Sequence, residues 1–73
     1  GKISITSGNN GNVTLSKDGK IILLVPSGKT ENISVAVGDE VSIKAYGSQQ
    51  KLTINGVEKI NEKEIQGEEG TEY

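Results

Sequence analysis

The sequence predicts an all-β fold, a small antiparallel β-sandwich or barrel of about six short strands that forms a single β domain over residues 1–73. Several short segments alternate apolar and polar residues, as strands with one buried face do. Turn-forming Gly, Asn and Asp residues separate these segments at intervals of roughly 6 to 12 residues. No segment is long enough for the crossover helix that a parallel sheet requires.

The apolar residues are almost all Ile, Val and Leu, a composition that favours strands. The chain has two Tyr and no Phe, Trp, Met or Cys, so large aromatic anchors and disulfides are both absent. A chain of 73 residues buries only about 60 to 65% of its unfolded surface. We therefore expect a small aliphatic core with little stability to spare.

Ile3 and Ile5 alternate with polar residues and predict the first strand, which ends in the turn-rich loop 7–11. A second strand follows around Val13 and Leu15, and Asp18-Gly19 then fits a two-residue type I′ hairpin turn.

A regular hairpin around this turn pairs Leu15 with Ile22 and so divides the apolar run 20–25 between two faces. One face then holds Val13, Leu15, Ile22 and Leu24. The other face holds Ile21, Leu23 and Val25, three apolar side chains that need cover from a second layer.

Pro26 ends this run, since proline cannot donate to a central ladder. An alternating pattern then follows at Ile33, Val35 and Val37. After Gly38-Asp39 the alternation resumes at Val41, Ile43 and Ala45. A three-residue loop at Gly38 aligns the two apolar faces in a hairpin. Alternatively, the chain crosses at Gly38 from one sheet to the other, and the sequence does not choose between these two arrangements.

Leu52 and Ile54 predict another short strand before the strong turn signal Asn55-Gly56. Residues 1–57 contain six Lys and four acids, whereas residues 58–73 contain two Lys and six acids. Residues 58–73 are therefore expected to form an acidic C-terminal strand or arm, and residues 58–65 fit a helical turn or a strand equally well.

The composition argues against catalysis, because the chain has no His for general acid and base work and no Cys nucleophile. We therefore expect a protein that is not an enzyme and carries no cofactor, and zinc is disfavoured for the same reason. Calcium stays open, since Asp39 with Glu40, or Glu68 with Glu69, offers oxygen ligands.

The charged residues predict neither a nucleic-acid partner nor membrane insertion. All eight basic residues are Lys, the net charge is −2, and no Arg supplies bidentate phosphate or base contacts. No apolar run approaches the roughly 20 residues that a transmembrane helix needs.

Three segments carry the resemblance of this chain to a known class of module: Ile33–Ala45, Leu52–Gly56 and the Gly70-Thr-Glu-Tyr73 ending. The chain resembles the small Ig-like β-sandwich modules of bacterial surface proteins and phage virion proteins. The resemblance implies a non-catalytic structural or interaction module, acting in adhesion or assembly, with an extracellular, cell-surface or virion location. In modules of this kind a final strand usually follows the Gly-Thr-x-Tyr pattern, whereas nothing follows Tyr73 here. We therefore expect either that the chain is a piece of a longer protein or that another chain supplies or covers that edge.

The predicted interaction surface consists of Ile21, Leu23, Val25 and Tyr73, and its partner is a protein or a second copy of this chain. Cover from within the chain would have to come from Val57, Ile60 and Ile65. The alternative function is binding of a glycan or calcium by the loops, which are Gly8–Asn12, Pro26–Thr30 and Gly47–Gln50. Tyr46 and Tyr73 are the only aromatic rings available for a sugar.

Overall fold

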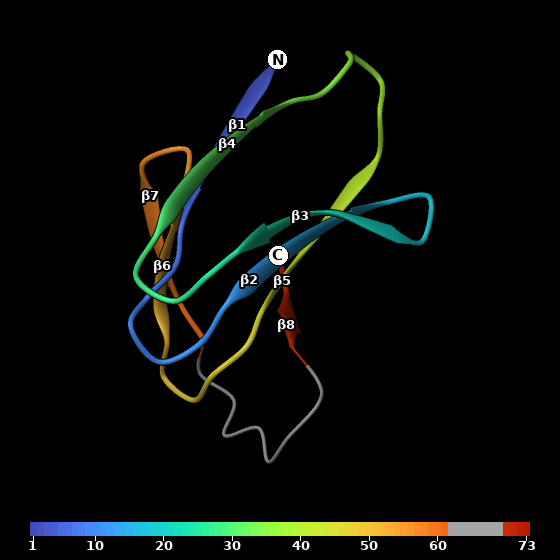
Figure 1. Ribbon diagram of the computed structural model, residues 1–73. Helices are drawn as coiled ribbons and strands as arrows, with labels where there is room; N and C mark the ends of the chain where they lie inside the picture. The colour runs from blue at the N-terminus through green and yellow to red at the C-terminus, as the bar shows by residue number, and fades with distance from the viewer. Residues whose placement is uncertain (62–69) are drawn as a thin grey trace.

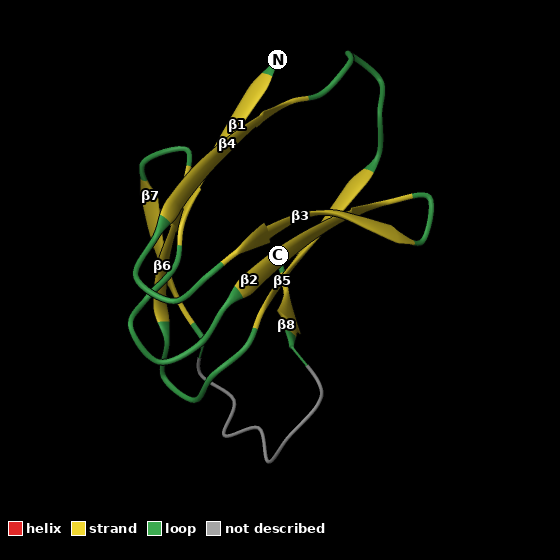
Figure 2. Ribbon diagram, viewed as in Figure 1, coloured by secondary structure: helices red, strands yellow, loops and turns green. Residues whose placement is uncertain are grey.

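The computed structural model describes residues 1–61 and 70–73, and these residues form strands, turns and loops without a helix (Figure 1, Figure 2). Two four-stranded antiparallel sheets make up the fold, so the all-β prediction is confirmed. The strands are β1 (Lys2–Thr6), β2 (Val13–Lys17), β3 (Lys20–Val25), β4 (Thr30–Ser34), β5 (Val41–Ala45), β6 (Lys51–Ile54), β7 (Val57–Ile60) and β8 (Thr71–Glu72).

Sheet A has the strand order β4-β1-β6-β7 and sheet B has the order β3-β2-β5-β8. The described residues thus form eight strands where the sequence predicted about six. The two additional strands are β7 and β8, which lie in the acidic segment 58–73 or at its border. Residues 57–60 are therefore a strand, whereas Ile65 and the Glu68-Glu69 pair lie outside the described residues.

The core lies between the two sheets and consists of aliphatic side chains. Its buried members are Ile5, Val13, Leu15, Val25, Ile43, Ala45 and Leu52. Complete burial of a Val, Leu or Ile side chain contributes about 1.5–3 kcal/mol. Six such residues and Ala45 make a small core, in agreement with the composition.

The β2–β3 hairpin begins as predicted and then departs from the predicted register. Asp18 and Gly19 have φ values of 53° and 75°, and the first pairs are Lys17 with Lys20 and Ser16 with Ile21. The register then shifts, because Leu15 pairs with Leu23 and leaves Ile22 as the extra residue of a β-bulge.

This bulge reverses the predicted faces of the rest of β3. Leu23 and Val25 face the core with Val13 and Leu15, while Leu24 pairs with Thr14 on the outer face. The predicted layer containing Ile22 and Leu24 is therefore wrong. The physical reason is the extra residue of the bulge, which moves every later side chain of β3 to the opposite face. Leu23 and Val25 then lie beside the core, and the favourable turn is kept.

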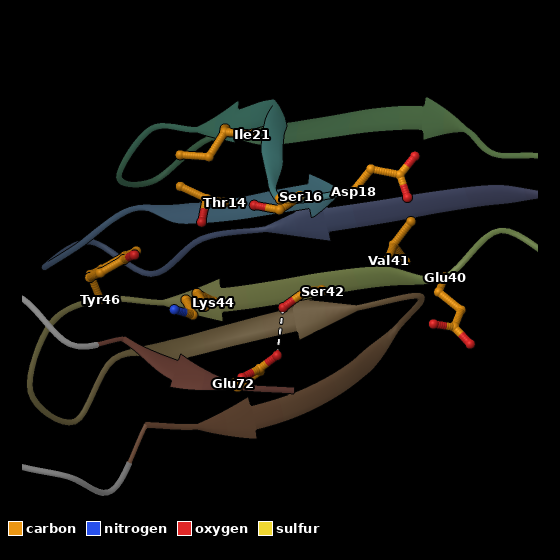
Figure 3. A pocket seen from close by; sticks show the side chains of 11 residues that line it. Thr14, Ser16, Asp18, Ile21, Glu40, Val41, Ser42, Lys44, Tyr46 and Glu72 are labelled. Atoms are coloured by element: carbon orange, nitrogen blue, oxygen red, sulfur yellow. Dashed lines mark hydrogen bonds between the residues drawn. The ribbon is translucent and has the colours of Figure 1, made fainter.

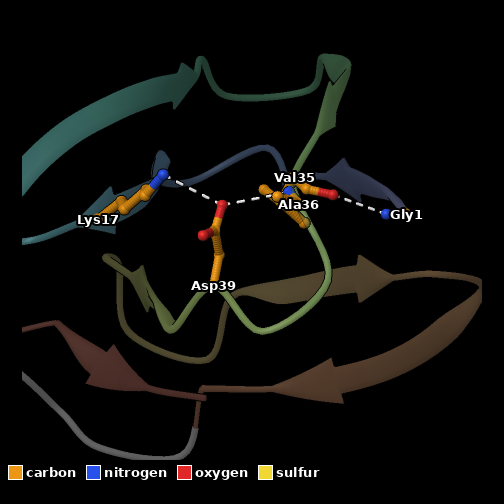
Figure 4. Close-up of polar contacts among 5 residues, drawn as sticks. All are labelled: Gly1, Lys17, Val35, Ala36 and Asp39. Carbon is orange, nitrogen blue, oxygen red and sulfur yellow. Dashed lines mark hydrogen bonds and ion pairs between the residues drawn. The ribbon is translucent and has the colours of Figure 1, made fainter.

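The chain crosses from sheet A to sheet B between β4 and β5, so the crossing alternative at Gly38 is confirmed (Figure 1). Strand β4 ends at Ser34, and Val37 is 98% exposed in the crossover, so the strand pattern predicted as far as Val37 is wrong at its end. Figure 4 shows how polar contacts fix the crossover. Asp39 Oδ2 accepts from the Ala36 N–H at 3.1 Å and lies 3.1 Å from Lys17 Nζ.

Candidate interaction surface

The four edge strands of the two sheets differ in how they are protected from pairing with another chain. On β4, Glu31 pairs with the buried Ile5, and on β7, Lys59 pairs with the buried Leu52. Opposed residues of an antiparallel pair lie on the same face, so both edges carry a charged residue on the inner face, a device that prevents edge-to-edge pairing. Strand β8 has only two described residues, and a short edge strand offers few backbone groups for pairing with another chain.

Strand β3 is a six-residue edge whose inner-face residues near the core are both apolar, Leu23 and Val25. Its one charged residue is Lys20, at the end beside the turn. The remaining side chains are large and aliphatic, with Ile21 63%, Ile22 43% and Leu24 52% exposed. The bulge at Ile22 is thus the one protective device of an otherwise apolar edge.

The four residues predicted as an interaction surface have different positions in the structure. Ile21 is exposed on the outer face, Leu23 is partly buried against the core, and Val25 is fully buried. Tyr73 is also partly buried against the core, and its hydroxyl donates to the Ile60 carbonyl oxygen at 3.0 Å. The structure therefore brings Ile21 together with Ile22 and Leu24 rather than with Leu23 and Val25.

Val57 and Ile60 do not cover strand β3. Both belong to β7, which is the edge of sheet A beside β6, and they are 57% and 42% exposed. Inner cover for Leu23 and Val25 comes instead from the core between the sheets, to which β1 contributes Ile5. The described residues leave the outer face of β3 open to solvent.

The outer face of sheet B forms a shallow hollow of about 630 Å³ next to the exposed residues of β3 (Figure 3). Figure 3 shows Ile21 on one side of the hollow, Thr14 and Ser16 of β2 next to it, and Lys44 and Ser42 along β5 beyond them, with Tyr46 at one end. Ser42 Oγ donates to Glu72 Oε1 at 2.6 Å. The lining also includes Asp18 and Glu40, so this hollow carries three carboxylates and one ammonium group.

Cross-strand pairing explains why these residues share one surface. Leu24 pairs with Thr14, Thr14 with Lys44, and Lys44 with Glu72, which makes one row of side chains across all four strands. Ile21, Ser16 and Ser42 make a second row on the same face. Sheet B therefore presents an apolar edge that continues into a polar centre.

The loops predicted for ligand binding meet at one end of the sandwich, at the lower left of Figure 1. The Gly28 N–H donates to the Gly8 carbonyl oxygen at 2.8 Å, and Asn10 Nδ2 donates to the Ser48 carbonyl oxygen at 2.5 Å. These contacts join all three predicted loops. We refer to the loops Gly8–Asn12, Pro26–Thr30 and Gly47–Gln50 together as the loop end.

Of the carboxylates considered for calcium binding, Asp39 makes structural contacts, whereas Glu68 and Glu69 lie outside the described residues. Hydrogen bonds from Lys17 and then from the Ala36 N–H hold the pKa of Asp39 below its usual 3.8, despite a small opposing effect of desolvation. Within residues 1–61 and 70–73, no group of three or more acidic residues could hold a metal ion. The Asp39 carboxylate therefore acts in this structure as an anchor of the crossover.

No family model matches the chain, and neither a curated protein nor a solved structure matches it. In the part of the chain that the structure describes, no helix has the length and apolarity of a membrane span. The assignment of function therefore depends on the surfaces described above.

Sequence reasoning missed Ile22 and Leu24 as exposed residues and missed the hollow beside them. A signal was present, because the run 21–25 has five consecutive apolar residues and a strand with one solvent face cannot bury them all. The position of the bulge was not encoded in the alternation pattern, so the sequence could not say which of the five were exposed.

Proposed function

We propose that this protein is a non-catalytic structural or interaction module that acts in adhesion or assembly through sheet B. The observation that carries the proposal is the exposed aliphatic edge of β3, formed by Ile21, Ile22 and Leu24. The two-sheet architecture and the resemblance to Ig-like modules of bacterial surface and phage virion proteins support a role of this kind, at a cell surface or in a virion.

The contrast between the edge strands supports β3 as the strand that contacts a partner. Strands β4 and β7 each carry a charged residue on the inner face, Glu31 and Lys59, which a partner strand would have to accommodate. Strand β3 has no charged side chain over Ile21 to Val25, and the protection it has there is the bulge at Ile22. A partner strand added here gains backbone hydrogen bonds and removes aliphatic surface from water.

The partner that fits this edge is a second copy of the same chain. An antiparallel pairing about a two-fold axis between Ile22 and Leu23 sets Ile21 of one copy opposite Leu24 of the other. Both side chains lie on the outer face of sheet B, as the pairing requires. The two Lys20 residues then lie at opposite ends of the interface, separated by roughly 17 Å along the strand, so their repulsion is small.

The test is the oligomeric state of the full chain as a function of concentration. Sedimentation equilibrium should show a mass rising from 7.7 kDa towards twice that value. Leu24→Lys places a charge at the centre of the interface, and we expect it to leave a monomer whose melting temperature is close to that of the parent chain. Ile21→Lys should have the same effect.

Val37→Lys is the matched control, because Val37 is 98% exposed and belongs to the crossover loop rather than to β3. It should leave the association unchanged. A parent chain that remains monomeric at millimolar concentration would rule out the second copy as the partner. Equal loss of association in the Val37→Lys variant would show that the contact is not made by β3.

A further inference from the structure

The loop end is built as a fixed scaffold, independently of the edge of β3. Its centre is Gln50, a fully buried side chain whose Oε1 accepts from the Gly8 N–H at 2.8 Å. Gln50 Nε2 donates to the carbonyl oxygens of Asn12 and Tyr46. One buried amide therefore ties the first loop to the third.

A second buried amide, Asn61, holds the third loop from the opposite side. Asn61 Nδ2 donates to the carbonyl oxygens of Gly47 at 2.8 Å and Ala45 at 3.2 Å. Gly11 approaches this loop so closely that a Cβ there would overlap the Tyr46 carbonyl group. Satisfied buried amides and close backbone packing restrict loop motion, so the groups that the loops present are preorganised.

These loops line an open, shallow hollow of about 490 Å³, a volume in the size range of small-ligand sites. Its lining residues include Thr6, Asn9, Asn10 and Gln49, which carry hydroxyl or carboxamide groups, and the exposed Lys51, which carries an ammonium group. No Asp or Glu among the described residues lines it. This composition is opposite in charge to the hollow on sheet B, which has three carboxylates.

One backbone feature at the hollow carries an energetic cost. Gln49 has a φ of 57°, in the left-handed region where a side chain costs roughly 1 kcal/mol. Glycine would adopt this conformation without that cost, as Gly47 does two residues earlier with a φ of 106°. The chain nevertheless has a carboxamide at this position of the rim.

We propose that the hollow at the loop end binds a saccharide that carries a carboxylate group. Carboxamide and hydroxyl groups both donate and accept hydrogen bonds, which suits the hydroxyl groups of a sugar ring. The Lys51 ammonium group supplies a charge-assisted bond to the carboxylate of the sugar. The absence of carboxylates from the described lining disfavours a cationic ligand at this site.

The experiment is an amide NMR titration of the full chain with 3′-sialyllactose, with tetragalacturonate and with lactose as the neutral match of the first probe. We expect one or both acidic probes to shift the signals of Asn9, Asn10 and Lys51, with little change from lactose. Lys51→Gln should weaken this binding about tenfold, the equivalent of one charge-assisted hydrogen bond, whereas Lys51→Arg should keep most of the affinity.

Lys44→Gln is the matched control, because Lys44 is also an exposed strand lysine but belongs to the hollow on sheet B. It should bind the acidic probes as the parent chain does. No shift with either acidic probe would overturn the proposal, as would equal binding of lactose. Equal binding of inorganic phosphate at the same residues would reduce the site to a simple anion site and would also overturn it.

Discussion

The two hairpins of this protein have the same kind of turn but behave differently beyond it. Asp18-Gly19 joins β2 to β3 and Asn55-Gly56 joins β6 to β7, and all four turn residues have φ values between 50° and 80°. The second hairpin stays in register for its whole length, from Ile54 with Val57 to Lys51 with Ile60. The first hairpin keeps two pairs and then bulges at Ile22.

The difference shows that a two-residue turn fixes only the pairs closest to it. In β6–β7 the regular register already places Leu52 on the inner face, so alternation and burial agree. In β2–β3 the regular register would bury Ile22 and Leu24 instead of Leu23 and Val25. The core selects Leu23 and Val25, and the strand inserts one residue to present them.

The largest expected effect comes from placing a charge on one face or the other of β3. Val25→Asp puts an unpaired carboxylate into the core, and we expect a loss of at least about 4 kcal/mol, enough to unfold a domain of this size. Leu24→Asp places the same group in solvent and should cost about 1 kcal/mol or less. Urea denaturation of both variants, at concentrations where the parent is monomeric, measures the difference. If Leu24→Asp were the less stable variant, the result would support the regular register without the bulge.

A smaller effect is expected from deleting one residue from β3 and, in a second variant, one residue from β7. Deletion of Ile22 removes the extra residue of the bulge and keeps Leu23 and Val25 on the inner face, so the loss should stay within about 1 kcal/mol. Deletion of Glu58 shifts the register of β7 and displaces the buried Asn61, whose lost hydrogen bonds should cost more than about 2 kcal/mol. Thermal unfolding of the two deletion variants checks this order, and equal losses would contradict the role given to the bulge.

The smallest expected effect concerns the ion pair of Lys17 with Asp39, which ties the first hairpin to the crossover. The pKa of Asp39 is lowered in the folded state, so its carboxylate stabilises the fold above pH 3.8, the usual value, and this contribution disappears as the pH falls through the lowered pKa. Asp39→Asn should therefore be slightly less stable than the parent at pH 7 and nearly equal to it at pH 2. Melting temperatures at the two pH values test this, and a difference that persists at pH 2 would contradict it.

The sequence determined the fold class, both hairpin turns and the aliphatic core, because alternation and positive-φ residues act over a few neighbouring positions. It left open the crossing at Gly38 and whether residues 58–60 belong to a helical turn or a strand, since both depend on contacts distant in the chain.

Only the tertiary structure decided which residues of the run 20–25 face solvent, and it placed three separate loops around Gln50 and Asn61. Both registers place two aliphatic residues of β3 on the inner face, and the bulge selects Leu23 and Val25 over Ile22 and Leu24 by shifting the strand by one residue. The strands that enclose the core come from both sheets and are separated along the chain, so a local pattern cannot contain that choice.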